Sequence, residues 1–321
     1  MPTLNELLHA SSRTFAVGID RLPHPLRAEV EAAYLLLRVS DYLEDNESMD
    51  PARKAALLGQ WARVLEGDED VRALERDMGP ADEPTPDALV ARHVSQVTQA
   101  FHGMRQEARA VVGRHVCNSS RGMARWTLRG PDLADEADLD DYMHEVAGRV
   151  GWLLTELFAL DVPEVAGRRT EMMALGREFG LGLQTVNVIR GLHSDWRRGW
   201  VYVPRAFGGG DSADGLFGAE GNPERSHRVL GHLVDKADRH LAQARRYIEL
   251  IPRRHHGIRL FCLLPYLFAV RTLAVSRGNR AVFREEVKIG RQEVRRIVRA
   301  AWLRGWSNGW IGRYAEKLGR T

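Results

Sequence analysis

Apolar residues recur at spacings of three and four along nearly the whole chain, and no long stretch alternates between apolar and polar residues. This period is that of an amphipathic α-helix and not that of a β-strand. The segments between the periodic stretches are short and rich in glycine, proline and aspartate, which favour turns. The pattern predicts helices over residues 26–46, 52–67, 91–112, 138–160, 168–195, 223–250, 257–276 and 285–318.

The breaks between these helices are too short to force a domain boundary, and no internal repeat is present. A chain of 321 residues is long enough to bury a sizeable core. We therefore expect an all-α fold in which residues 1–321 form a single domain. The sequence does not fix the oligomeric state.

Composition and charge are those of an ordinary globular protein, with 44% hydrophobic and 28% charged residues and a net charge of +3. This small charge argues against wholesale binding of nucleic acid. A local basic excess lies in residues 284–320, where ten lysines or arginines face four glutamates. A solvated helix face is the favoured interpretation, and a contribution to holding an anionic substrate is the alternative.

Two cysteines, Cys117 and Cys262, form neither a CxxC motif nor a disulfide framework, and the first residues lack the pattern of a secretory signal. The longest uncharged apolar run covers residues 260–270 and includes Pro265. Spanning a bilayer takes about 20 apolar residues, so we expect a buried core helix here and no transmembrane segment. These features predict a cytoplasmic protein.

The sequence DYLED, residues 41–45, is the first candidate for chemistry. Asp41 and Asp45 are four residues apart, so both carboxylates project from one face of the predicted helix. Two like charges at this spacing repel unless a cation lies between them, and Mg²⁺ is commonly held by one or two carboxylates together with water and phosphate oxygens. Arg38 and Tyr34 continue the same stripe. Taken alone, the pair is also typical of an acidic helix end on the surface.

A second candidate face lies within residues 180–204. Gln184, Asn187, Gly191 and Asp195 follow one another at helical spacing and present amides, one carboxylate and no bulk. Nearby arginines are suited to charge-assisted hydrogen bonds with phosphate. This face predicts a helix that lines a cavity; the arginines are Arg190, Arg197 and Arg198.

A third stretch, residues 141–154, places Tyr142 one turn before Ala147, Gly148 and Gly151. A glycine inside a helix costs about 1 kcal/mol relative to alanine, so it usually allows close packing or leaves room for a ligand.

Together these stretches resemble the squalene and phytoene synthase family, and the resemblance runs along most of the chain. Five elements carry it in the order typical of the family. They are SSRTF (11–15), YLLLRVSDYLED (34–45), YMHEVAGRVG (142–151), LQTVNVIRGLHSDWRRGWVYVP (183–204) and IRLFCLLPYLFAVRTL (258–273).

The resemblance implies an isoprenoid-synthase helical bundle around a deep central cavity. It also implies that Asp41, Asp45 and Asp195 bind Mg²⁺ and that Tyr142 lies near the reacting carbons. An allylic prenyl diphosphate of C5 to C20 would be the substrate, ionised as Mg²⁺ and arginines stabilise the departing pyrophosphate. The residues implied to hold or orient the diphosphate are Arg13, Arg38, Arg190, Arg198, Gln184 and Asn187.

Position 191 departs from the family pattern, because the second acidic motif normally has two aspartates and here Gly191 stands where one is expected. The interpretation favoured by the sequence is transfer of one prenyl group to a non-isoprenoid, carbazole-like aromatic acceptor, a small molecule that the freed space admits. Head-to-head condensation of two prenyl diphosphates to a squalene- or phytoene-type product is the alternative. A non-catalytic prenyl-binding descendant is a third interpretation.

Aromatic residues recur every four positions near the carboxyl end, at Trp302, Trp306, Trp310 and Tyr314. Within one helix this spacing forms a stripe. Core packing is the predicted role of the stripe, and an aromatic lid over a cavity is the alternative.

Overall fold

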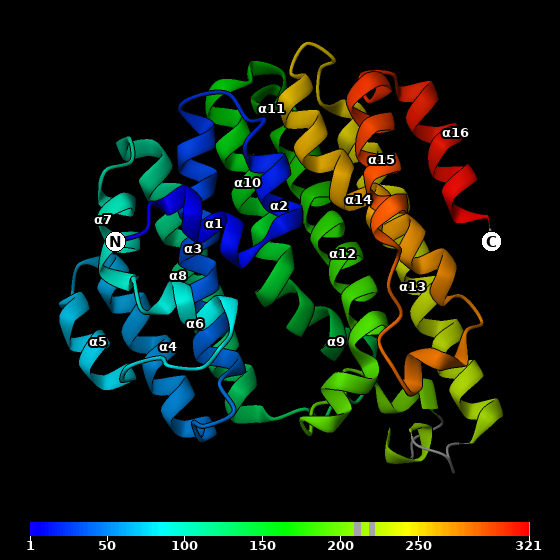
Figure 1. Cartoon of the computed structure of the whole chain (residues 1–321), viewed down its shortest axis with the longest axis horizontal. Helices are drawn as coiled ribbons and strands as arrows, with labels where there is room; N and C mark the ends of the chain where they lie inside the picture. The colour runs from blue at the N-terminus through cyan, green and yellow to red at the C-terminus, as the bar shows by residue number, and fades with distance from the viewer. Residues whose placement is uncertain (209–212, 218–221, 321) are drawn as a thin grey trace. The chain divides into compact units, whose positions relative to one another are not determined.

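The structure is a computed structural model that describes residues 1–208, 213–217 and 222–320, except the side chains of Arg13, Thr14, Ala213 and Asp214. Within these ranges the regular elements are helices, and none is a strand, which confirms the all-α prediction (Figure 1). The chain divides into two compact units, residues 1–129 with 152–169 and residues 130–151 with 170–321. A single domain around one deep cavity stays a prediction.

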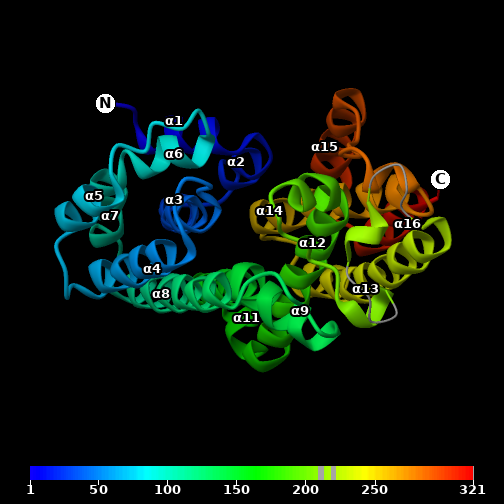
Figure 2. The ribbon, with the colours of Figure 1, turned by 90° about the horizontal axis from the view of Figure 1, so that it is seen from below.

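The first unit is built around one central helix, α3, which packs against six other helices of the unit. Figure 2 shows α4 and α8 side by side beneath it. Leu35, Leu36 and Leu43 of α3 are fully buried among these helices. The helices are α1 (Leu4–Ser11), α2 (Arg13–Ile19), α3 (Leu26–Asp45), α4 (Pro51–Glu66), α5 (Val71–Met78), α6 (Pro86–Ala91), α7 (Val94–His102) and α8 (Gln106–Arg129), followed by most of α10 (Arg149–Asp161) and by α11 (Pro163–Gly167).

In the second unit α14 is the central helix and packs against α13, α15 and α16. Its longest helices are α12 and α13, which are joined by the pairing of Glu178 with His240. The α-helices are α9 (Glu136–Met143), α12 (Arg169–Arg197), α13 (Pro223–Leu250), α14 (His256–Ser276), α15 (Arg291–Arg304) and α16 (Asn308–Gly319). A π-helix, η1 (His144–Gly148), links α9 to α10, and 3-10 turns are η2 (Arg205–Gly208), η3 (Ala213–Leu216) and η4 (Arg280–Phe283).

Local signals set several helix ends. At α4, the Asp50 side chain accepts a hydrogen bond from the backbone N–H of Arg53, and Pro51 occupies the first helical position. Gly67 ends the same helix in the left-handed conformation, φ +86°. At α13, Asn222 caps the helix and Pro223 begins it. Such caps satisfy the free backbone groups at helix ends, so they fix where a helix starts and stops.

Two predicted helices are wrong in extent. The stretch 91–112 is the end of α6, all of α7 and the start of α8, with a break at Gly103. The stretch 285–318 is α15 and α16, separated at Gly305. Glycine loses more backbone freedom in a helix than other residues, so a helix readily stops there. Beside the break at Gly305 the core prediction is wrong for Trp302 and Trp306, which are 55% and 51% exposed, whereas Trp310 and Tyr314 are half-buried.

The apolar run around Pro265 belongs to α14, which is 21 residues long and agrees with the helix predicted over residues 257–276. By length and composition alone this helix could cross a bilayer, with a mean hydropathy of 1.7 in its most apolar window. However, 72% of that window is buried inside the protein. Burial of this extent is what the core-helix prediction requires.

Candidate active site

The DYLED acids lie at the carboxyl end of α3. Asp41 and Asp45 occupy successive turns of the same helix, with Asp45 as its last residue. Arg38 precedes them by one turn, and its Nη2 lies 2.5 Å from Asp41 Oδ2. The structure therefore places a cation directly beside the first acid, as the sequence predicts.

A residue that the sequence analysis missed, Asp87, completes this cluster. Asp87 lies in the first turn of α6 and accepts a hydrogen bond from Arg38 Nη1 at 3.1 Å. The guanidinium carbon of Arg38 also lies over the ring of Tyr34, 5.3 Å from its centroid. The Nε of Arg38 is buried and has no hydrogen-bond partner. Arg38 is thus held at both Nη atoms, and only its Nε has no partner.

The electrostatics of the cluster favour a bound cation. Burial raises the pKa of Asp41 to about 7, although Arg38 lowers it, and the carboxylates of Asp87 and Asp45 raise it further. A divalent cation next to these oxygens would stabilise the ionised form and reverse this shift. The donor set, carboxylate oxygens with open sides, suits a hard cation such as Mg²⁺.

No group of three or more His, Cys, Asp or Glu side chains is arranged as a metal site among the described residues. A magnesium ion at Asp41 and Asp45 would therefore take its remaining ligands from water and substrate phosphate, as this ion usually does. Asp195 belongs to the other unit, so a metal cluster shared by all three aspartates stays a prediction.

On α12 the predicted polar face is open to solvent and its opposite face is buried. Asn187 is exposed, Gln184 is half-buried, and Asn187 Nδ2 donates to Gln184 Oε1 at 3.4 Å. On the opposite side, Ile189 and Leu192 are buried. The amides of this face are bonded to each other and are accessible to a ligand from the solvent side.

At the end of this face Asp195 is held by Arg198, whose Nη2 lies 2.6 Å from Asp195 Oδ1. A Cβ added to Gly191 would meet Asp195 Oδ2 at 2.9 Å, and its next nearest neighbours would also be atoms of that carboxylate. The space freed by the missing side chain is thus partly filled by the surviving acid. This corrects the expectation that the glycine simply leaves open room.

The remaining predicted phosphate ligands are only partly placed. Arg190 projects from α12 with its Nε 3.4 Å from Glu286 Oε1, and its side chain is 45% exposed. It therefore has only a weak partner to release when an anion binds. The side chain of Arg13, the first residue of α2, lies outside the described part of the structure.

Tyr142 is buried at the end of α9 and stacks on Tyr202, a residue that the sequence analysis did not single out. Their ring centroids are 4.6 Å apart at an interplanar angle of 17°. The Tyr142 hydroxyl donates to the Tyr202 hydroxyl at 3.0 Å. Trp200 extends the stack, 5.9 Å from Tyr202. The three rings form an aromatic surface whose faces favour nearby positive charge.

The glycine-rich segment after Tyr142 consists of the π-helix η1 and the start of α10, both packed tightly against α12. A Cβ on Gly151 would overlap the backbone carbonyl of Gly176, and a Cβ on Gly180 would overlap that of Ala147. The glycines therefore serve close packing, one of the two roles predicted for them. Single-turn π-helices inside α-helices are frequent at functional sites.

His144, within η1, stays neutral. Burial lowers its pKa to about 4, and the nearby Arg149 and Arg177 lower it further. Arg177 Nε donates to His144 Nδ1 at 3.3 Å, which requires the unprotonated nitrogen. His144 therefore helps to fix η1 against α12 without adding charge.

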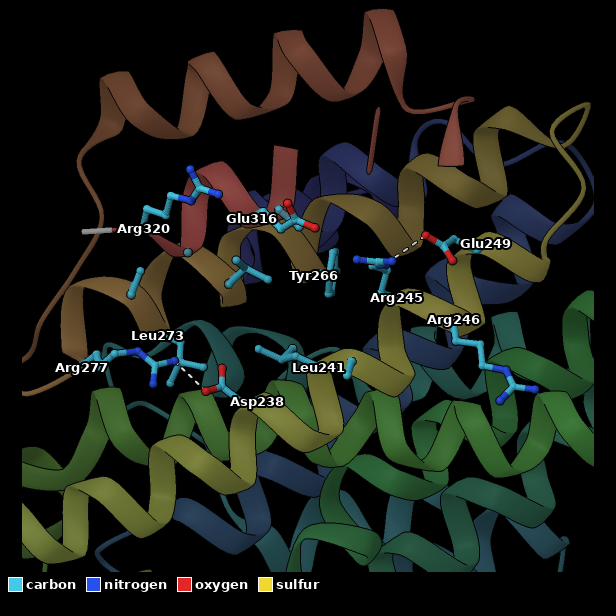
Figure 3. Close-up of a pocket in the computed structure, with 15 residues that line it drawn as sticks. Asp238, Leu241, Arg245, Arg246, Glu249, Tyr266, Leu273, Arg277, Glu316 and Arg320 are labelled. Carbon is cyan, nitrogen blue, oxygen red and sulfur yellow. Dashed lines mark hydrogen bonds and ion pairs between the residues drawn. The ribbon is translucent and has the colours of Figure 1, made fainter. Parts of the chain in front are cut away.

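A cleft of the second unit lies elsewhere, between α13, α14 and α16 (Figure 3). It encloses about 760 Å³ and is lined by none of the predicted site residues. Two of its arginines are already paired, Arg277 with Asp238 at 2.7 Å and Arg245 with Glu249 at 3.0 Å. This cleft is therefore a poor candidate for the diphosphate site.

The chain matches known proteins along most of its length. The family model described as squalene/phytoene synthase matches residues 8–293. Squalene synthase of Eremothecium gossypii is 31% identical over 292 residues, which are 88% of this chain and 64% of that protein. Squalene synthase 1 of Arabidopsis thaliana is 28% identical over 297 residues, 91% of this chain and 69% of that protein. The chain thus spans about two thirds of the length of these relatives.

Among solved structures, the complex of TcSQS with the ligand BPH1237 superposes with a TM-score of 0.82. The two chains are 24% identical, and the match covers 98% of this chain and 90% of that one. At this identity the likeness shows a shared all-α fold.

Proposed function

Because the chain belongs to the squalene/phytoene synthase family, we propose that it is a prenyltransferase that ionises an allylic prenyl diphosphate with the help of Mg²⁺. We further propose that it joins two such diphosphates head to head and releases pyrophosphate. This second step was the alternative in the sequence analysis. The relatives named squalene synthase support it better than they support a non-isoprenoid acceptor.

The observation that carries the proposal is the cluster on α3. Arg38 lies between Asp41 and Asp87, and its buried Nε has no partner. A buried donor without a partner costs free energy that an anionic ligand would recover. The acids beside it suit the metal that a diphosphate brings with it. An anion site and a cation site would thus be adjacent on one helix.

In this proposal different residues of the chain have different roles. Mg²⁺, when bound, would neutralise charge on the departing pyrophosphate. Arg38 would donate to phosphate oxygens through Nε, and Asp87 would keep its guanidinium in place. Gln184 and Asn187 would orient ligands along the open face of α12, where Arg190 and Arg198 add positive charge. The aromatic faces of Tyr142, Tyr202 and Trp200 would shelter the allylic cation from water.

Transfer to an aromatic acceptor remains a second candidate because one observation favours it. Gly191 removes the second acid of the α12 motif, so this motif has fewer ligands for a metal. Only one diphosphate needs to be ionised when the acceptor is not itself a diphosphate. The proximity of Asp195 to Gly191 weakens this candidate, since it reduces the room for an acceptor.

Product analysis separates the two candidates. Purified protein with Mg²⁺ is incubated with farnesyl or geranylgeranyl diphosphate, with and without NADPH, and products are identified by mass spectrometry. A second set adds a panel of aromatic acceptors, including carbazoles. Head-to-head condensation predicts a C30 or C40 product that needs no acceptor. A prenylated aromatic without any such product would replace the first proposal by the second.

A further inference from the structure

Three large apolar side chains stand together on the surface of the second unit. Trp302, Leu303 and Trp306 are 55%, 62% and 51% exposed, and they lie at the end of α15 and in the turn before α16. We call these three residues the aromatic corner. Figure 1 shows this turn at the same end of the unit as the connection between α13 and α14. Contiguous exposed apolar side chains usually mark an interaction site.

The backbone beneath the aromatic corner is held rigidly. Arg259 is fully buried, and its guanidinium donates to the carbonyls of Gly305 and Ile251 and to the side chain of Asn308. It thereby ties the turn to the end of α13. On the other side of the turn, His256 Nε2 lies 3.2 Å from the Trp302 carbonyl oxygen. A fixed backbone presents the exposed rings at little entropic cost on binding.

The surface next to the aromatic corner is strongly basic. On α15, Arg299 precedes Trp302 by three residues and Leu303 by four, so it lies on the same helix face. Arg295 and Arg296 lie one turn further back on that face. Two more arginines, Arg304 and Arg313, flank the turn. All five arginines are exposed, and none of them forms an ion pair within the described part of the chain.

We propose that the aromatic corner and the arginines of α15 form a docking surface for an anionic lipid bilayer. Tryptophan favours the boundary between headgroups and acyl chains, because its ring is apolar and its N–H is polar. Arginine covers the apolar boundary with its stem and keeps its charge among the anionic headgroups. A surface that combines exposed tryptophan and leucine with unpaired arginines is typical of proteins that lie on a membrane.

The charge of this surface argues against a second copy of the chain as the occupant. A symmetric dimer through this face would bring the same unpaired arginines of both copies together, and like charges in an interface are unfavourable. An anionic bilayer offers many phosphates without fixed geometry, which matches arginines spread along a helix face.

Vesicle sedimentation tests the proposal without any substrate, so the result does not depend on the proposed reaction. Wild-type protein is mixed with vesicles of neutral phosphatidylcholine, or of phosphatidylcholine containing about a third phosphatidylglycerol. We expect binding to the anionic vesicles that weakens with salt. Replacing both tryptophans, Trp302→Gln with Trp306→Gln, should weaken partitioning at least about tenfold. Arg295→Gln and Arg299→Gln should each weaken it about fivefold.

Leu128 provides a matched control, because it is 63% exposed, against 62% for Leu303, and lies on α8 in the other unit. Leu303→Gln should reduce vesicle binding, whereas Leu128→Gln should leave it unchanged. Both substitutions exchange one exposed apolar side chain, so both variants should keep the wild-type melting temperature.

Equal binding of the wild type and of the double tryptophan variant to anionic vesicles would overturn the proposal, as would no binding at all. Sedimentation velocity without lipid gives the third outcome. If wild-type protein self-associates and Trp302→Gln with Trp306→Gln abolishes this association, the surface is an interface between copies and the membrane proposal is wrong.

Discussion

The carboxylate of Asp195 lies back along α12 over Gly191, with Oδ2 2.9 Å from the position that a Cβ at residue 191 would take. Its other oxygen accepts a hydrogen bond from Arg198 at 2.6 Å. The glycine therefore allows Asp195 to fold toward its own helix and pair with an arginine. A side chain at position 191 would displace this carboxylate from its place over the glycine.

Gly191→Asp tests what the glycine does. In head-to-head condensation the new acid restores a pair of carboxylates four residues apart, so we expect product formation to rise by about tenfold. The initial rate of C30 or C40 product formation is measured at several Mg²⁺ concentrations.

Gly191→Ala is the control, since its methyl group displaces Asp195 without adding a charge; we expect it to leave the rate within about threefold of wild type. If Gly191→Asp instead abolishes prenylation of an aromatic acceptor and yields no condensation product, the second candidate function is supported and the first is wrong.

Asp41→Asn and Asp45→Asn should each lower turnover at least about 100-fold without unfolding the protein. Amides are neutral and bind Mg²⁺ more weakly than carboxylates, while their shape is nearly the same. The assay uses saturating Mg²⁺, with the melting temperature recorded in parallel. Glu47→Gln, an exposed acid two residues beyond Asp45, should behave as wild type. Full activity in both aspartate variants would refute the metal assignment.

Mg²⁺ affinity should fall as the pH drops below about 7, because the pKa of Asp41 is raised to about 7 and the protonated carboxyl does not bind the ion. Asp87→Asn removes one of the charges that raise this pKa, so the midpoint should move to lower pH. Calorimetric titration with Mg²⁺ between about pH 5 and 8 measures both curves. An identical midpoint in the two proteins would show that Asp87 does not act on Asp41.

Relationships that are local in the sequence were predictable. The periodic stretch 223–250 coincides with α13, because Asn222 and Pro223 form a clear start signal. The shared face of Asp41 and Asp45 also follows from helix geometry alone, as does the open face formed by Gln184 and Asn187. For such features the helical period is sufficient, and tertiary contacts do not alter it.

Contacts between distant segments were not predictable in the same way. Asp87 is 49 residues from Arg38, and Tyr202 is 60 residues from Tyr142, so no period connects the members of either pair. The tryptophan stripe is the opposite case, because its residues have helical spacing in the sequence but do not lie on one helix. A spacing of four predicts one face only while the helix continues, and the break at Gly305 places Trp302 and Trp310 on different helices.

Gly151, at the start of α10, lies directly against the backbone of α12, whereas Gly231 of α13 faces open space. Gly151→Ala should lower the free energy of unfolding by about 1–3 kcal/mol or more, because the new methyl overlaps the Gly176 carbonyl and only a backbone shift relieves the clash. Gly231→Ala is the matched control: this glycine lies inside α13, is exposed, and a Cβ added there would meet no atom within 4 Å. There alanine should stabilise the protein by about 0.5–1 kcal/mol, since it loses less backbone entropy in a helix. Urea unfolding followed by circular dichroism measures both changes. Equal stability of the two variants would mean that the contact between Gly151 and Gly176 is loose enough to admit a methyl group, and that the glycines of this segment are needed for something other than packing.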